Sequence, residues 1–124
     1  MEPSRDAVIL FGHGSRDPLW RQPIDAVAGR LRARHPGLAV ECAFLELTDP
    51  DLPTVGTGLA ARGARHVVIV PMFLGTGRHA REDLPLLVAQ LAQAHPRTEF
   101  RLRPAVGEDP RLLELLADIA GDDS

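Results

Sequence analysis

Two of the five histidines lie in glycine-rich segments, where a side chain is free to take part in chemistry. His13 stands in the segment Gly12-His13-Gly14-Ser15-Arg16, and His79 closes the segment Gly75-Thr76-Gly77-Arg78-His79. Flanking glycines allow a sharp turn and leave an imidazole exposed rather than packed. Imidazole binds divalent metals and moves protons near neutral pH. Both histidines are therefore candidates for metal binding or acid–base catalysis.

Glu46 is the third candidate, and it follows an apolar run in Phe44-Leu45-Glu46-Leu47. Its carboxylate is suited to accepting protons or to contacting a metal, but a carboxylate after a strand also serves simply to cap the next turn. The remaining histidines have structural interpretations. His35 and His95 precede prolines at expected helix ends, and His66 begins an expected strand.

Other kinds of site fit the sequence less well. No Cys-x-x-Cys or close histidine pair completes a four-ligand zinc site. The Gly12–Ser15 segment lacks the spacing and the lysine of a Walker motif, and Gly75-Thr76-Gly77 lacks the third glycine of a dinucleotide fingerprint. Ser15 lacks the sequence context of a nucleophile elbow. Two imidazoles with a carboxylate form an open ligand set, which suits a metal held transiently or proton transfer.

Alternating strands and helices must position these residues. Continuous apolar runs predict central parallel strands covered on both faces, and an alternating run predicts an edge strand. Spacings of i, i+3, i+4 and i+7 predict helices, with Asp109-Pro110 as an N-cap and N1 pair and Gly63 as a C-cap. Pro85 is compatible with its helix only in the first turn. The expected strands are Ala7–Phe11, Leu38–Phe44, His66–Phe73 and Thr98–Leu102, and the expected helices cover Ile24–Leu31, Asp51–Arg62, Leu84–Leu91 and Asp109–Leu116.

This order predicts one doubly wound α/β domain over residues 1–124, with a mainly parallel four-stranded sheet flanked by helices. Right-handed crossovers place the loops after the strands along one edge. In the flavodoxin-like order 2-1-3-4, the ligand crevice lies between the first and third strands. His13 and His79 are then expected to face each other across it, with Glu46 nearby.

Composition excludes several classes of protein. The 124 residues carry a net charge of −3, with 14 arginines and no lysine, so general nucleic-acid binding is not expected. No apolar run reaches the roughly 20 residues of a membrane span. The single cysteine, Cys42, and an N-terminus without the pattern of a secretion signal favour a cytoplasmic location.

Three segments together resemble the class II tetrapyrrole chelatases, in the short sirohydrochlorin cobaltochelatase and ferrochelatase group. The first is Val8–Arg16, the second is Phe44-Leu45-Glu46 followed by Pro50, and the third is Val70–His79 continued by Asp83-Leu84-Pro85. They occur in the family's order and span nearly the whole chain, roughly residues 7 to 104.

The resemblance implies insertion of Co²⁺ or Fe²⁺, or in some relatives Ni²⁺, into sirohydrochlorin or a related tetrapyrrole, for cobalamin or siroheme-type cofactors. The metal is then a substrate, and no permanent cofactor is expected. His13 and His79 match the family's metal-site histidines, and Glu46 matches an acidic catalytic position. Short family members pair as homodimers, so a homodimer is expected. The loops around the histidines supply the expected substrate contacts: Gly14, Ser15, Arg16, Leu74, Gly75 and Arg78.

Two other functions remain open at this point. A metallochaperone or tetrapyrrole carrier has the same site without turnover. A phosphatase-like enzyme with His13 as nucleophile ranks last, because Gly12 precedes His13 where an arginine is expected. Metal preference is not encoded in such a ligand set, which accepts several first-row ions.

Overall fold

A computed structural model describes residues 6–123. The strands are β1 (Ala7–Gly12), β2 (Ala39–Phe44), β3 (His66–Pro71) and β4 (Glu99–Leu102). The helices are α1 (Gln22–Arg34), α2 (Leu52–Ala61), α3 (Arg78–Ala94) and α4 (Pro110–Ala120), with a 3₁₀ turn, η1, at Val106–Glu108. Residues 1–5, on which the expectation of no secretion signal rests, lie outside the described part.

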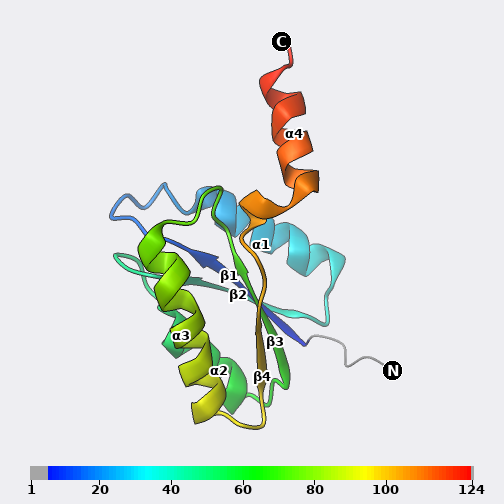
Figure 1. Ribbon diagram of the computed structural model, residues 1–124. Helices are drawn as coiled ribbons and strands as arrows, with labels where there is room; N and C mark the ends of the chain where they lie inside the picture. Colours follow the sequence, from blue (N-terminus) through cyan, green and yellow to red (C-terminus); the bar gives the residue numbers. More distant parts are fainter. Residues whose placement is uncertain (1–5, 124) are drawn as a thin grey trace.

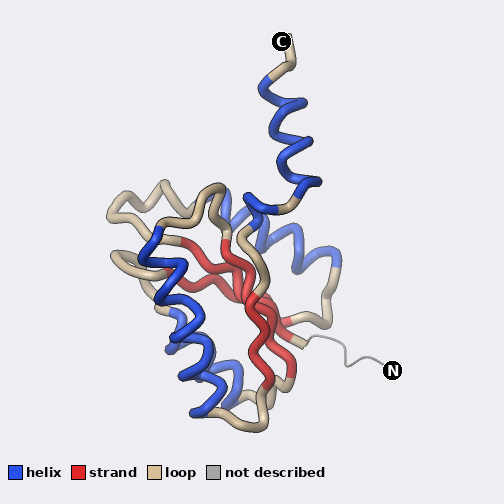
Figure 2. Tube along the Cα trace, in the orientation of Figure 1, coloured by secondary structure: helices blue, strands red, loops and turns tan. Residues whose placement is uncertain are grey.

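The sheet is parallel throughout and has the order β2-β1-β3-β4, which confirms the expected α/β fold and strand order. Figures 1 and 2 show the four strands side by side, with α2 and α3 covering one face and α1 behind the other. No helix within residues 6–123 is long and apolar enough to cross a membrane.

The larger core lies between the sheet and the pair α2 and α3. Ile9, Phe11 and Ile69 point into it from the strands, and Leu59 and Leu84 meet them from the helices. A smaller core lies under α1, where Ile24 and Ala28 pack on side chains of β1 and β2. Every residue of β1 is buried, as its continuous apolar run predicts for a strand covered on both faces.

β3 departs from the same prediction, because only alternate residues are fully buried. Val67 and Ile69 lie in the larger core, whereas Val68 and Val70 on the opposite face are half-buried. The cause is the position of α4, which has no buried residue within the described part and stands away from the sheet (Figure 1). Only α1 covers that face, and it lies over β1 and β2.

The third helix is longer than predicted. α3 begins at Arg78, so Pro85 lies inside the helix and the prediction of a first-turn proline is wrong. His79 consequently lies in the first helical turn rather than in the loop. Pro85 is solvent-exposed, and it leaves one carbonyl of the preceding turn without an N–H partner within the helix.

The N-cap predicted at Asp109 is confirmed, and Asp51, which the sequence analysis did not name as a cap, caps α2 in the same way. The Asp51 carboxylate accepts a hydrogen bond from the Thr54 N–H at 2.9 Å, and the Asp109 carboxylate accepts one from the Arg111 N–H at 2.9 Å. Gly63 follows the end of α2 with φ +88°, the left-handed conformation that favours glycine after a helix. The strand bounds differ from the predicted ones by one or two residues.

Candidate functional site at the carboxyl edge of the sheet

The three loops that carry the candidate residues follow neighbouring strands. Because β2, β1 and β3 are adjacent and parallel, the segments after Phe44, Gly12 and Pro71 leave the sheet at the same edge. Backbone hydrogen bonds continue past the strand ends: the Leu45 N–H donates to the Gly12 carbonyl at 3.0 Å, and the Met72 N–H donates to the Phe11 carbonyl at 2.8 Å. The site therefore rests on an extension of the sheet.

His13 is exposed, and its backbone is held tightly. The Glu46 N–H donates to the His13 carbonyl at 3.1 Å. Gly14 has φ +103°, and a Cβ there would overlap the Glu46 carbonyl oxygen. On the other side, a Cβ on Gly12 would lie 2.8 Å from Cδ1 of Ile24. Gly14 is therefore required by the backbone, whereas a side chain at Gly12 would force the tip of Ile24 to shift. The left-handed conformation of Gly14 confirms the sharp turn predicted around this imidazole.

The His13 ring contacts one aromatic side chain. It meets the buried Phe73 ring edge-on, with centroids 5.5 Å apart and planes at 72°. Phe73 belongs to the loop after β3 and in turn packs on Phe11. This contact orients the imidazole toward the loop that leads to His79.

Two residues brace the loops in a way that the sequence analysis missed. The Thr48 hydroxyl accepts a hydrogen bond from the Ser15 N–H at 2.9 Å and donates one to the Ser15 carbonyl at 2.8 Å. Gly107, in η1, donates its N–H to the Phe73 carbonyl at 2.9 Å, and a Cβ there would overlap the Leu74 carbonyl. Nothing in the sequence around Thr48 or Gly107 predicts these contacts, because each partner is far away in sequence.

Glu46 lies exposed on the β2 loop, next to Leu47, whose φ of +63° is left-handed. The loop ends in a cis peptide bond between Asp49 and Pro50. The backbone hydrogen bond to His13 fixes the position of the Glu46 backbone, from which its side chain extends. Glu46 thus neighbours His13 through the backbone of two hydrogen-bonded loops.

His79 and Arg78 open α3 on the other side of His13. Both are exposed, and Arg78 approaches Glu82 one turn later at 3.4 Å, with both side chains largely in solvent. A pair of this kind contributes little stability, so Arg78 remains available to a ligand. Leu74 and Gly75 precede this helix at the exposed edge, and the Leu74 side chain is 67% exposed.

Ser15 and Arg16 occupy the loop after β1. The Ser15 hydroxyl accepts a hydrogen bond from the Asp17 N–H at 3.0 Å, so its oxygen takes part in the loop's own turn. Arg16 is exposed. Within residues 6–123, no group of three or more histidine, cysteine, aspartate and glutamate side chains is arranged to hold a metal ion. The loops bring the two histidines and Glu46 to one edge without assembling them into such a cluster.

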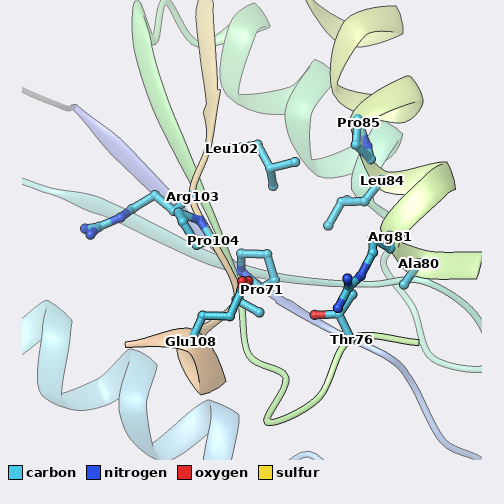
Figure 3. A pocket seen from close by; sticks show the side chains of 11 residues that line it. Pro71, Thr76, Ala80, Arg81, Leu84, Pro85, Leu102, Arg103, Pro104 and Glu108 are labelled. Atoms are coloured by element: carbon cyan, nitrogen blue, oxygen red, sulfur yellow. The ribbon is translucent and has the colours of Figure 1, made fainter. Parts of the chain in front are cut away.

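A hollow of about 240 Å³ lies beside this edge, between the start of α3 and the chain after β4. Thr76, Ala80 and Arg81 line one side of it, and Pro104 and Glu108 line the other. Figure 3 shows the Arg81 side chain extending along this hollow toward Thr76. Sequence analysis did not single out Arg81 as a site residue, yet it presents a cation at the same edge as His79.

Comparison with known proteins identifies the family. The model of the CbiX family matches residues 7–122. The chain belongs to the CbiX family. This confirms the resemblance stated from the three sequence segments.

Named relatives of this CbiX chain are sirohydrochlorin chelatases. A sirohydrochlorin cobaltochelatase of Methanothermobacter thermautotrophicus is 30% identical over 128 positions, covering 90% of this chain and 87% of the relative. One from Methanocaldococcus jannaschii is 24% identical, covering 93% and 97%. Others are matched less fully: the alignment spans 58% of a Methanococcus aeolicus sirohydrochlorin cobaltochelatase and 42% of the Bacillus subtilis sirohydrochlorin ferrochelatase.

Solved structures agree with the fold of this CbiX chain. A putative cobalamin biosynthesis CbiX protein from Marinobacter aquaeolei superposes with a TM-score of 0.79 at 31% identity, covering 92% of each chain. The sirohydrochlorin chelatase SirB from Bacillus subtilis in complex with cobalt superposes with a TM-score of 0.79 at 28% identity, covering 97% of this chain and 51% of SirB.

Proposed function

We propose that this chain is a sirohydrochlorin metal chelatase. It inserts a divalent metal, Co²⁺ or Fe²⁺ with Ni²⁺ as a further candidate, into sirohydrochlorin or a related tetrapyrrole. The observation that carries the proposal is the placement of two histidines after adjacent parallel strands of a CbiX-family chain: His13 in the loop after β1, and His79 in the first turn of α3, which follows β3. The chelatase names of the relatives support the same reaction.

In this reaction the metal exchanges its initial ligands for the four pyrrole-type nitrogens of the macrocycle. Two N–H protons leave the macrocycle in the same process. Neutral imidazoles suit the first step, because they bind borderline divalent ions and leave coordination positions open for incoming nitrogens. We assign His13 and His79 to hold the metal before transfer. Both are exposed, so an ion and a wide planar substrate can reach them.

Protons from the macrocycle need an acceptor close to the metal. Glu46 is the assigned acceptor, since its backbone bonds directly to that of His13 and its carboxylate is exposed at the same edge. Either histidine is suited to the same task when it is not bound to metal. Each accepted proton passes to solvent, which is accessible at this open edge.

Substrate contacts follow from the surrounding loops. Sirohydrochlorin carries many carboxylates, and arginine binds these through paired, charge-assisted hydrogen bonds. Arg16 follows His13 by three residues and Arg78 directly precedes His79; both are exposed and are assigned to this role. Exposed Leu74 offers apolar surface to the ring, while Gly14, Ser15 and Gly75 shape the loops that receive it.

The rest of the proposal concerns the state of the protein. The chain acts as one chelatase-like domain, pairs as a homodimer, works in the cytoplasm and retains no permanent cofactor. The product feeds cofactor synthesis of the cobalamin or siroheme type, and the name of the Marinobacter aquaeolei neighbour supports the cobalamin branch.

The test is metalation in solution. Purified protein is mixed under anaerobic conditions with sirohydrochlorin and Co²⁺, Fe²⁺ or Ni²⁺, and the absorbance change of the macrocycle is followed. We expect acceleration over the spontaneous reaction, lost in His13→Ala and in His79→Ala. His35→Ala is the matched control, because His35 is exposed at the C-terminal end of α1, away from this edge.

Two results contradict the proposal. One is a folded wild-type protein with no acceleration for any of the three metals. The other is stoichiometric binding of metal or pigment without multiple turnovers, which identifies a carrier instead. A rate unchanged in both site variants contradicts the assignment of the histidines.

A further inference from the structure

Leu47, on the loop after β2, has an unusual backbone conformation. Within residues 6–123 it is the only residue other than glycine with a positive φ, at +63°. For a residue with a bulky side chain this left-handed conformation is a genuine outlier, whereas glycine and asparagine adopt it readily. The backbone at this position therefore favours a residue other than leucine.

The Leu47 side chain does not compensate for this strain by packing. It is 56% exposed and belongs to neither core cluster. A single exposed leucine needs no explanation by itself, and Leu86, 62% exposed on α3, is an ordinary example because leucine favours a helical backbone. At Leu47 both the backbone and the exposed side chain oppose stability. Strained residues of this kind persist where a function uses them.

Contacts on both sides of Leu47 attach it to the loop that carries His13. The preceding residue, Glu46, donates its N–H to the His13 carbonyl at 3.1 Å. The following residue, Thr48, bonds through its hydroxyl to both the N–H and the carbonyl of Ser15. Leu47 thus links two fixed points of the β1–β2 loop contact, and its exposed side chain leaves the protein from there.

A second exposed leucine has a matching position on the loop after β3. Leu74 is 67% exposed and directly follows Phe73, whose ring contacts the His13 ring. Leu47 in the same way directly follows Glu46, which bonds to the His13 backbone. Apolar side chains therefore leave two neighbouring loops, each one residue beyond a contact with His13.

We infer that Leu47 is a substrate-binding residue, whose side chain packs against the tetrapyrrole ring beside His13. This inference rests on the proposed function and deepens it, since it adds a second apolar contact to the one assigned to Leu74. Sites for small molecules are lined mainly by apolar side chains, with a few polar groups that fix orientation. Leu47 supplies such an apolar surface next to Glu46, the assigned proton acceptor, where the ring nitrogens must arrive.

Charge favours the ring itself, rather than its carboxylates, as the partner of Leu47. The exposed Glu46 carboxylate beside it repels the acidic groups at the periphery of sirohydrochlorin, which Arg16 and Arg78 are assigned to bind. The two bonded neighbours also hold the Leu47 backbone in place before substrate arrives. A side chain on a fixed backbone loses less freedom on binding, which favours affinity.

The test compares Leu47→Asn with the wild type. Metal-free sirohydrochlorin is titrated against each protein, and its absorbance gives the dissociation constant. We expect binding about tenfold weaker, because burial of most of a leucine side chain is lost. The Tm, measured by far-UV circular dichroism, is expected to rise by about 2–5 °C, because asparagine accepts the left-handed backbone. The affinity for Co²⁺ alone should not change, since leucine has no metal ligand.

Leu86→Asn is the matched control, because it makes the same substitution at a similarly exposed leucine. It should leave sirohydrochlorin binding unchanged and lower the Tm, since asparagine is a poorer helix former than leucine. Two further variants separate the side chain from the backbone. Leu47→Gly should bind sirohydrochlorin as weakly as Leu47→Asn, whereas Leu47→Met keeps an apolar side chain and should bind nearly as well as the wild type.

Four results overturn the inference. They are unchanged sirohydrochlorin binding in both Leu47→Asn and Leu47→Gly, a lowered Tm in both, an equal loss of Co²⁺ affinity, or a changed mass of Leu47→Asn in light scattering coupled to gel filtration. The last result assigns Leu47 to a protein contact instead.

Failure of this inference and failure of the proposed function are distinguishable. A wild type that binds sirohydrochlorin through Leu47 without accelerating metalation refutes only the proposed chelatase reaction. A wild type that accelerates metalation, with sirohydrochlorin binding unchanged in both Leu47→Asn and Leu47→Gly, refutes this inference alone.

Discussion

The backbone conformation and the close packing at Gly14 strongly restrict which residue can occupy this position. Its φ of +103° is strained for any residue with a side chain, and an added Cβ would overlap the backbone carbonyl of Glu46. A backbone atom cannot rotate away as a flexible side-chain tip does. In Gly14→Ala the loops after β1 and β2 must therefore separate.

The expected loss of stability has two parts. Placing alanine in a sparsely populated backbone region costs about 1–3 kcal/mol. Separation of the loops weakens the hydrogen bond from the Glu46 N–H to the His13 carbonyl, which contributes about 1 kcal/mol more. The sum is about 2–4 kcal/mol. For a domain of this length that corresponds to a fall in Tm of roughly 8–16 °C.

Gly75→Ala is the matched control for this experiment. Gly75 lies in the loop after β3 at the same edge, its φ is not left-handed, and an added Cβ meets nothing within 4 Å. Thermal unfolding of both variants, followed by far-UV circular dichroism, is the assay. Gly75→Ala should stay within about 2 °C of wild type. If the two variants unfold at the same temperature, the assignment of the β1–β2 loop contact as a structural constraint is refuted.

Four further outcomes are expected. Thr48→Val removes both hydrogen bonds to Ser15 and should lower the unfolding free energy by about 1–3 kcal/mol in urea titrations, and an unchanged midpoint would contradict the bracing role. Gly58→Ala, at a helical position where a Cβ meets nothing within 4 Å, should raise stability by about 0.5–1 kcal/mol in the same titration. Hydrogen bonds from the Arg111 side chain and N–H lower the pKa of Asp109 from 3.8 to about 2. The Asp109 carboxylate therefore stabilises the folded state fully above pH 3.8, and this stabilisation is lost as the pH falls toward 2. An acid titration of the helicity of α4, compared between wild type and Asp109→Asn, measures this loss. Burial raises the pKa of the Cys42 thiol above 9.0, so reaction with a disulfide reagent at pH 8 should be slow in folded protein and fast in urea, and equal rates would show that the thiol is not buried.

The sequence predicts the strand order because its local signals agree with one another. β1 has an unbroken apolar run and is buried on both faces, and the helix cap at Asp109 falls where the sequence predicts it. The start of α3 escapes prediction for a physical reason. Its first turn, from Arg78, is polar and exposed, so it carries no apolar periodicity until Ala80 and Leu84 reach the core.

β3 shows what an apolar pattern does and does not encode. The run predicts burial on both faces, but it contains no information about which element supplies the cover or how far that element reaches. In the described structure α2 and α3 bury Val67 and Ile69, while Val68 and Val70 stay half-open. The prediction of a doubly covered β3 is therefore wrong within the described residues.

The exposed turn around His13 was predictable from residue types, and the distant contacts that hold the loops were not. Glycines on both sides of His13 indicate an exposed imidazole in a sharp turn, which the structure contains. The reason for the turn is nevertheless non-local. Thr48 holds Ser15 across 33 positions of sequence, and Gly107 holds the loop of Phe73 from beyond β4. Such contacts depend on strand register, which must be known before any pair can be assigned.

Glu46 consequently belongs to the site in two separable ways. Its N–H and carbonyl form the surface against which the His13 turn is closed, and any residue that accepts this loop conformation supplies those atoms. In the proposed function its carboxylate has a second role, as the acceptor of protons from the macrocycle. An acidic residue at this position is therefore not explained by the backbone contact. The backbone contact would be the same with a glutamine at this position, so the acidic side chain is the part of Glu46 that the proposed proton transfer needs.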